Sequence, residues 1–299
     1  MWESLIDELP PDRVRVVENG AYGPAIALAA GGAHATVALQ GAQLLSWRPA
    51  HHAEVIWLSP EAQRVEGKSL RGGTPVCWPW FGQHPEGGDR PAHGFARGAP
   101  WRIHHAGADE HASMVALSFE TGPQHAQLWP HDAKAMLLVT LGADAIDLEL
   151  RTSNTGREPF SLTQALHTYF AVGDIARTRV LGLEGCNYID TVGPWTRRRE
   201  HGPVTFGGEV DRIYLATPAM IEIDDIANAR RIAVESRGSR SAVVWNPWIE
   251  KSARLGDMGP EGYRRMVCVE TANAADDVVT ITPGDHHVMA ATYRVRSSL

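Results

Sequence analysis

The sequence lacks the short motifs that bind common cofactors or activate common nucleophiles. It contains no GxxxxGK[ST] phosphate loop, no GxGxxG dinucleotide fingerprint, no GxSxG nucleophile elbow and no HExxH zinc pair. These absences remove the sequence support for nucleotide-dependent, serine-hydrolase and zinc-protease chemistry. We therefore expect an activity that needs no cofactor.

Cysteine is scarce as well. The three cysteines, Cys77, Cys186 and Cys268, are widely separated and odd in number. They form neither a disulfide framework nor the closely spaced pairs of a zinc or redox site. We expect all three to be reduced, buried thiols.

Long apolar runs and a basic field are also missing. No stretch approaches the roughly 20 apolar residues of a membrane span, and the acidic start MWESLIDELPPDRV has no basic segment typical of a signal peptide. The net charge of −7 argues against nucleic acid or an anionic membrane as a partner. The sequence thus predicts a cytoplasmic protein in which any anionic ligand needs a local cationic pocket.

Short alternating runs dominate what is present. Residues 145–152, AIDLELRT, place Ile146, Leu148 and Leu150 on one face of an extended chain and charged residues on the other, the period of a half-buried strand. Similar β-rich runs lie at 13–18, 34–41, 42–47, 54–59, 114–120, 134–142, 219–224, 231–236, 242–246, 266–270, 278–282 and 286–296. Turn residues separate them without regular helices, which indicates an all-β fold, a large antiparallel β-sandwich.

Helices and domain boundaries are hard to find. Only residues 4–9 suggest a helix, and residues 59–63 suggest a turn. No fixed-period repeat, low-complexity linker or shift in composition divides the chain. Because large all-β folds often exceed the usual domain size, we expect a single domain over residues 1–299.

One aromatic stretch stands out: PVCWPWFG at 75–82, followed by HGFAR at 93–97. Two prolines exclude a helix and leave an extended, stiff segment. Such a segment suits the wall of a ligand pocket, and it equally suits a buried aromatic corner of a large β protein.

The candidates for acid–base chemistry are His167, Glu270 and Asp211, which lie within or beside apolar strand sequences. A carboxylate that ends such a run can have a raised pKa and act as a base near neutrality. Each residue alone also fits a structural role, as a hydrogen-bonded core histidine or a strand-end carboxylate. Fourteen histidines suggest a metal, but histidine doublets on a strand point to opposite faces, so we expect no catalytic metal.

Eight segments taken together resemble the aldose 1-epimerase superfamily, and more narrowly its hexose-6-phosphate mutarotases. In chain order they are QGAQLLSW, LRGGTPVCWPWFG, AHGFARGAPW, LHTYFAVGDI, GCNYID, DRIY, VVWNPWIEKSARLGDM and YRRMVCVETA, spanning about residues 40–272. The resemblance implies a galactose-mutarotase-like β-sandwich, in agreement with the strand pattern.

The resemblance also implies roles for the acid–base candidates. His167 matches the family's general acid toward the ring oxygen, and Glu270 its general base toward the anomeric hydroxyl. Asp211 matches a ligand of a sugar hydroxyl. Interconversion of α and β anomers needs only such an acid and base, and no cofactor.

The same resemblance assigns substrate contacts to the aromatic segment. Arg71 and Arg97 match substrate-binding residues and are the expected phosphate ligands, while His93 matches a pocket histidine. A glutamine that precedes the HG pair in some relatives is replaced by Ala92, and Gln83 could supply that contact.

Aromatic faces and a cationic rim together suggest a sugar phosphate as the ligand. Trp78, Trp80 and Phe81 could contact the C–H surface of a sugar or support the wall, and the arginines could hold a phosphate. Salt bridges from the arginines to acids such as Glu66 or Asp89 are the structural alternative.

These observations predict a monomeric enzyme that interconverts the anomers of hexose 6-phosphates, with glucose 6-phosphate as the first candidate. The alternatives are an aldose 1-epimerase acting on unphosphorylated sugars and a non-catalytic carbohydrate-binding or regulatory protein with the same fold. A pure binding protein would not need both His167 and Glu270.

Overall fold

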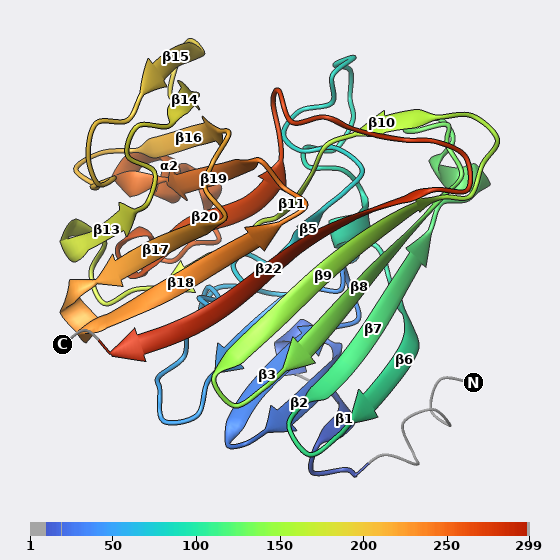
Figure 1. Cartoon of the computed structure of the whole chain (residues 1–299), viewed down its shortest axis with the longest axis horizontal. Helices are drawn as coiled ribbons and strands as arrows, with labels where there is room; N and C mark the ends of the chain where they lie inside the picture. The colour runs from blue at the N-terminus through green and yellow to red at the C-terminus, as the bar shows by residue number, and fades with distance from the viewer. Residues whose placement is uncertain (1–9, 19, 298–299) are drawn as a thin grey trace.

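Antiparallel sheets form the framework of the molecule. The computed structural model describes residues 10–18 and 20–297. Two eight-stranded sheets face each other, which confirms the predicted β-sandwich (Figure 1). The helix expected at 4–9 lies outside the described residues. The expectation of a single domain over the whole chain stays a prediction.

The first of these sheets, here called the long sheet, crosses the front of the view in Figure 1. In spatial order its strands are β13 (Thr178–Leu181), β17 (Met220–Asp225), β18 (Arg230–Arg237), β22 (His286–Ser297), β9 (Ala145–Asn154), β8 (Ala133–Leu141), β7 (Ser113–Glu120) and β6 (Arg102–Ala108). Ile146, Leu148 and Leu150 of β9 are fully buried, which confirms the alternation predicted for this run.

The second sheet is here called the site sheet. Its strands are β15 (Thr196–Arg199), β14 (Asn187–Asp190), β16 (Val210–Leu215), β19 (Ser241–Asn246), β20 (Met266–Asn273), β11 (Gln164–Leu166) and β5 (Val76–Cys77), and β12 (Tyr169–Ala171) also pairs with β20. Two smaller sheets comprise β1 (Val14–Glu18), β2 (Pro24–Ala30), β3 (Ala33–Ala38) and β4 (Leu44–Arg48), and the pair β10 (Phe160–Leu162) with β21 (Val279–Ile281).

Helices are few and short, as the sequence predicts. The α-helix α2 (Trp248–Leu255) directly follows β19 and was not predicted. The 3-10 turns are η1 (Gly20–Tyr22), η2 (Ala96–Gly98), η3 (Pro123–His125), η4 (Ile175–Arg177), η5 (Ile226–Asn228) and η6 (Gly262–Arg265). The turn predicted at 59–63 is confirmed, since the amide of Ala62 donates to the carbonyl of Ser59 over 3.0 Å.

The strand predicted at 54–59 is wrong. This segment forms only isolated bridges, Ile56 with Phe170 and Leu58 with Gly72. Its amides bond to several different segments, so no continuous ladder forms. Val55 donates to the carbonyl of Trp47, whereas Trp57 donates to that of Tyr169.

The central strand β20 connects the core to the functional face. All eight of its residues are buried, because it is covered on both faces. Val267 and Val269 belong to the main hydrophobic core, and Thr271 on the same face bonds to Ser236 of the long sheet over 2.7 Å. Because side chains alternate along a strand, Glu270 must point to the opposite face of the site sheet.

Candidate active site

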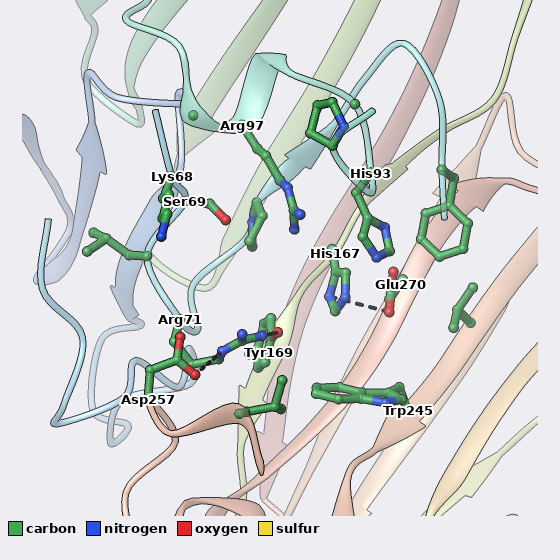
Figure 2. Close-up of a pocket in the computed structure, with 18 of the residues that line it drawn as sticks. Lys68, Ser69, Arg71, His93, Arg97, His167, Tyr169, Trp245, Asp257 and Glu270 are labelled. Atoms are coloured by element: carbon green, nitrogen blue, oxygen red, sulfur yellow. Dashed lines mark hydrogen bonds and ion pairs between the residues drawn. The ribbon is translucent and has the colours of Figure 1, made fainter. Parts of the chain in front are cut away.

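A cavity of about 710 Å³ lies over the face of the site sheet that carries Glu270. Strands β16, β19 and β20, helix α2 and the segments 67–71 and 81–98 contribute to its lining. The cavity brings together residues predicted from the sequence at distant positions: Arg71, Gln83, His93, Arg97, His167, Asp211 and Glu270. Figure 2 shows most of them converging on one space.

His167 and Glu270 face each other in this space. His167 Nδ1 lies 3.3 Å from Glu270 Oε1. The backbone of His167 is fixed by a 3.0 Å hydrogen bond from its amide to the carbonyl of Pro75, and its ring stacks on Tyr169 with centroids 5.0 Å apart. Neither His167 Nδ1 nor Glu270 Oε2 has a hydrogen-bond partner among the described residues. Buried polar atoms are rarely left unpaired, so these two mark an unusual pair in the protein interior.

Burial sets the proton affinities of this pair. It raises the pKa of Glu270 well above the usual value, with Asp211 adding to the effect and Arg97 opposing it. Burial also lowers the pKa of His167 far below its usual value, and the nearby His93, Arg97 and Arg71 lower it further. Both groups therefore favour their uncharged forms near neutral pH.

His93 forms part of the wall beside this pair. Its amide donates to the carbonyl of Gly82 over 2.7 Å, and its Nδ1 accepts from the amide of Gly82 over 3.3 Å. Burial, helped by Arg97 and Arg71, lowers the pKa of His93 to about 3. The imidazole is therefore neutral, and since Nδ1 is an acceptor, the proton is on Nε2.

The two predicted phosphate ligands have different surroundings. Arg71 Nε donates to Asp257 Oδ1 over 2.9 Å, and its Nη1 donates to the hydroxyl of Tyr169 over 3.1 Å. Burial lowers the pKa of Arg71, but Tyr169 and Asp257 outweigh it and the pKa is raised overall. Among residues 10–18 and 20–297, the one hydrogen bond of the Arg97 side chain runs from Nη2 to the carbonyl of Ala92, over 2.7 Å. Glu66 and Asp89, the acids considered from the sequence, are not the partners of either arginine in the described chain.

Asp211 lies at the edge of the cavity next to a lysine of α2. Lys251 Nζ is 3.3 Å from Asp211 Oδ2 and 2.7 Å from Glu209 Oε1. Burial raises the pKa of Asp211, although Lys251 opposes this. The carboxylate is thus held by Lys251 and still faces the cavity.

Trp80 does not line the cavity, which corrects the predicted direct contact with substrate. Its side chain is 3% exposed, and its indole nitrogen donates to the carbonyl of Pro91 over 3.0 Å. The ring packs edge-on against Phe95, with centroids 5.5 Å apart, and supports the wall from behind. Phe81 lines the cavity instead, and Gln83 lines it as predicted.

Sequence reasoning missed several residues of the cavity. Tyr169 and Asp257 hold Arg71, Trp245 packs edge-on against His167 at a centroid distance of 6.0 Å, and Lys68 carries an amine at the rim. Tyr169, Trp245 and Asp257 all stand within segments that carry the family resemblance. The pairing of Asp257 with Arg71 could not be assigned, because the two residues are 186 positions apart in the sequence.

The thiol of Cys268 was also missed as a neighbour of the acid–base pair. One ligand atom each of His167, Cys268 and Glu270 lies within 4.8 Å of the others. Cys77 and Cys268 are buried free thiols as predicted, but Cys186 is only half-buried, which corrects that expectation. The expectation of no metal requirement stays a prediction.

Comparison with known proteins agrees with this architecture. The aldose 1-epimerase family model matches residues 24–294. An Escherichia coli K12 protein named "Putative glucose-6-phosphate 1-epimerase" is 44% identical over 248 residues, which cover 81% of this chain and 80% of that protein. A protein of the same name from Cenchrus ciliaris is 36% identical, over 84% of this chain and 78% of that protein.

A solved structure is similar over the whole length. The crystal structure described as "a putative mutarotase (YeaD)" from Salmonella typhimurium superposes with a TM-score of 0.86 at 33% identity, covering 99% of this chain and 100% of that one. The chain therefore belongs to the aldose 1-epimerase family, and it is an isomerase. No helix in residues 10–18 and 20–297 is long and apolar enough to cross a membrane.

Proposed function

We propose that this enzyme interconverts the α and β anomers of hexose 6-phosphates, with glucose 6-phosphate as the first candidate. The observation that carries the proposal is the His167–Glu270 pair, which lines a cavity that also contains two arginines. The names of the E. coli and Cenchrus relatives support the phosphorylated substrate.

The pair can open the sugar ring without losing a proton to solvent. The resting uncharged pair becomes charged when the proton of Glu270 passes to His167, whose Nδ1 is 3.3 Å from Glu270 Oε1. Glu270 as carboxylate then takes the proton of the anomeric hydroxyl, while His167 as imidazolium gives one to the ring oxygen, so that the C1–O5 bond breaks and an aldehyde forms. The pair is then uncharged, which is the state that burial favours. After rotation about C1–C2, His167 takes the proton back from O5 and Glu270 returns one to O1.

The remaining cavity residues would hold the substrate. Asp211 and His93 would accept and donate hydrogen bonds to sugar hydroxyls, and Gln83 would provide the hydrogen bond that the side chain of Ala92 is unable to make. In Figure 2, Arg97, Lys68 and Arg71 lie on the same side of the His167–Glu270 pair. A phosphate on the far side of the sugar from C1 would meet these cations, and Arg97 lacks a carboxylate partner within the described residues.

The preference for phosphate can be tested by the ratio of kcat/KM for glucose 6-phosphate to kcat/KM for glucose. Arg97→Ala removes a charge-assisted bond, so we expect this ratio to fall about 10- to 100-fold while the activity on glucose changes little. Arg90→Ala is the matched control, because Arg90 lies in the same loop but pairs with Glu86 outside the cavity. A parallel fall in both activities would instead favour an aldose 1-epimerase for free sugars.

Arg71 is a less selective test site. Its guanidinium also holds Tyr169 and Asp257, so its removal disturbs the wall as well as the phosphate position. A monomeric state and a cytoplasmic location stay predictions.

A further inference from the structure

Cys268 gives the acid–base pair a third ligand type that anomer exchange does not require. The exchange needs one acid and one base, and His167 and Glu270 suffice for both roles. Cys268 is fully buried and lies two residues before Glu270 on β20, so both side chains point to the same face of the strand. The thiol therefore lies below the floor of the cavity, beside the pair.

One distance within this group matches that between two ligand atoms of a tetrahedral zinc site. Zinc bonds of about 2.0–2.1 Å to nitrogen and oxygen require roughly 3.3 Å between those two ligand atoms. His167 Nδ1 and Glu270 Oε1 are 3.3 Å apart. All three ligand atoms lie within 4.8 Å of one another, so a shift of the Cys268 sulfur toward the other two atoms would complete three corners of a tetrahedron.

Within the described residues, two polar side-chain atoms of this group lack a hydrogen-bond partner. His167 Nδ1 and Glu270 Oε2 have no hydrogen-bond partner in the described chain, and Glu270 is 1% exposed. Unpaired buried atoms of this kind gain free energy from any partner that reaches them. His167 and Glu270 also line the cavity, from which a water molecule could supply a fourth ligand.

We infer that His167, Cys268 and Glu270 form an inhibitory site for a thiophilic divalent cation, of which Zn²⁺ is the natural representative. A sulfur, nitrogen and oxygen ligand set favours Zn²⁺ over Mg²⁺ or Ca²⁺, which prefer oxygen ligands alone. The bound cation occupies both acid–base groups, so it competes with the sugar. Coordination by sulfur releases the thiol proton to solvent.

The first experiment measures inhibition of anomer exchange by Zn²⁺, and its readout rests on the proposed function. Added Zn²⁺ should raise the apparent KM of wild-type protein for glucose 6-phosphate, a chelator should reverse the effect, and Mg²⁺ at the same concentration should have none. Cys268→Ala and Cys268→Ser should each raise the Zn²⁺ concentration for half-inhibition about 10-fold or more, since even indirect ligand partners contribute that much. Cys77→Ala is the control, because Cys77 is an equally buried thiol outside the three-residue cluster.

A spectroscopic measurement tests the site independently of any activity. Co²⁺ bound to the wild-type protein should show a sulfur-to-cobalt charge-transfer band and the intense visible bands of tetrahedral cobalt, and both should disappear in Cys268→Ala and persist in Cys77→Ala. Circular dichroism would verify that each variant is folded. Equal Zn²⁺ inhibition of Cys268→Ala and wild type, or cobalt spectra without a thiolate band, would overturn the inference even if the enzyme proves to be a mutarotase.

Discussion

In the proposed mechanism, Glu270 and His167 share one transferable proton, and both protonation states of the pair have a use. The charged state would open the ring and the uncharged state would close it, so that neither direction needs exchange with solvent. Burial beside an apolar strand makes the uncharged state the resting form. The pair is thus best described as a unit with two macroscopic pKa values.

Removing either member of the pair should stop most of the catalysis. Glu270→Gln and His167→Asn keep the approximate shape of each side chain, so we expect folding to persist and kcat/KM to fall about 10²- to 10⁴-fold. Polarimetry of freshly dissolved α-anomer measures the effect, and thermal unfolding verifies the fold. Near wild-type turnover in either variant would contradict the mechanism.

The pH dependence of kcat/KM measures the protonation of the His167–Glu270 pair. Activity should fall at low pH as His167 of the protonated pair gains a proton, and at high pH as Glu270 loses its proton. The pKa of His167 is lowered and that of Glu270 is raised. We therefore expect the acid limb of the profile to lie below the usual histidine pKa of about 6.5. The alkaline limb should lie above the usual glutamate pKa of about 4.3, with a plateau between the two limbs. Glucose should be measured alongside glucose 6-phosphate, since the phosphate itself titrates near pH 6. An acid limb above pH 6.5 with both sugars would contradict this description.

At the scale of elements, the site depends on how the aromatic segment meets the HGFAR segment. Gly94 forms a bridge with Trp78, and a Cβ at Gly94 would lie 2.0 Å from the carbonyl oxygen of Trp78. The φ of Gly94 is +72°, in the region that favours glycine. This contact places His93 and Arg97 on the cavity side of the wall.

Gly94→Ala should therefore destabilise the protein by more than about 1 kcal/mol and weaken substrate binding. Urea unfolding and KM are the measurements. Gly87→Ala is the matched control, because Gly87 has a similar φ of +67° but a Cβ at this position would meet no other residue within 4 Å. Equal losses of stability and of substrate binding in the two variants would show that the close approach of Gly94 to Trp78 contributes to neither.

Which elements could be predicted depends on how regular their surroundings are. Strand β9 has one face in the core and the other partly exposed, so its alternation is visible in the sequence. Strand β20 is buried on both faces, so its sequence indicates a strand but not which face carries the site. Helix α2 has only eight residues and one buried side chain, too little for a clear helical period.

At the scale of the whole molecule, the family resemblance located the acid–base pair, and the three-dimensional contacts had to be found in the structure. The partner of Arg71 is Asp257, which lies far along the chain, whereas reasoning from sequence neighbours suggested Glu66 or Asp89. The exclusion of Trp80 from the cavity likewise follows from packing against Phe95 and Pro91. Local sequence motifs identify the candidate residues, whereas long-range packing determines which residues their side chains contact.

The most direct test of the proposed reaction is magnetisation exchange by NMR between the α and β anomers of glucose 6-phosphate at equilibrium. We expect the exchange rate to rise in proportion to the concentration of wild-type protein, well above the spontaneous rate. The same concentration of Glu270→Gln should leave the rate close to the spontaneous value. A wild-type protein that exchanges the anomers no faster than buffer alone would contradict the proposed function.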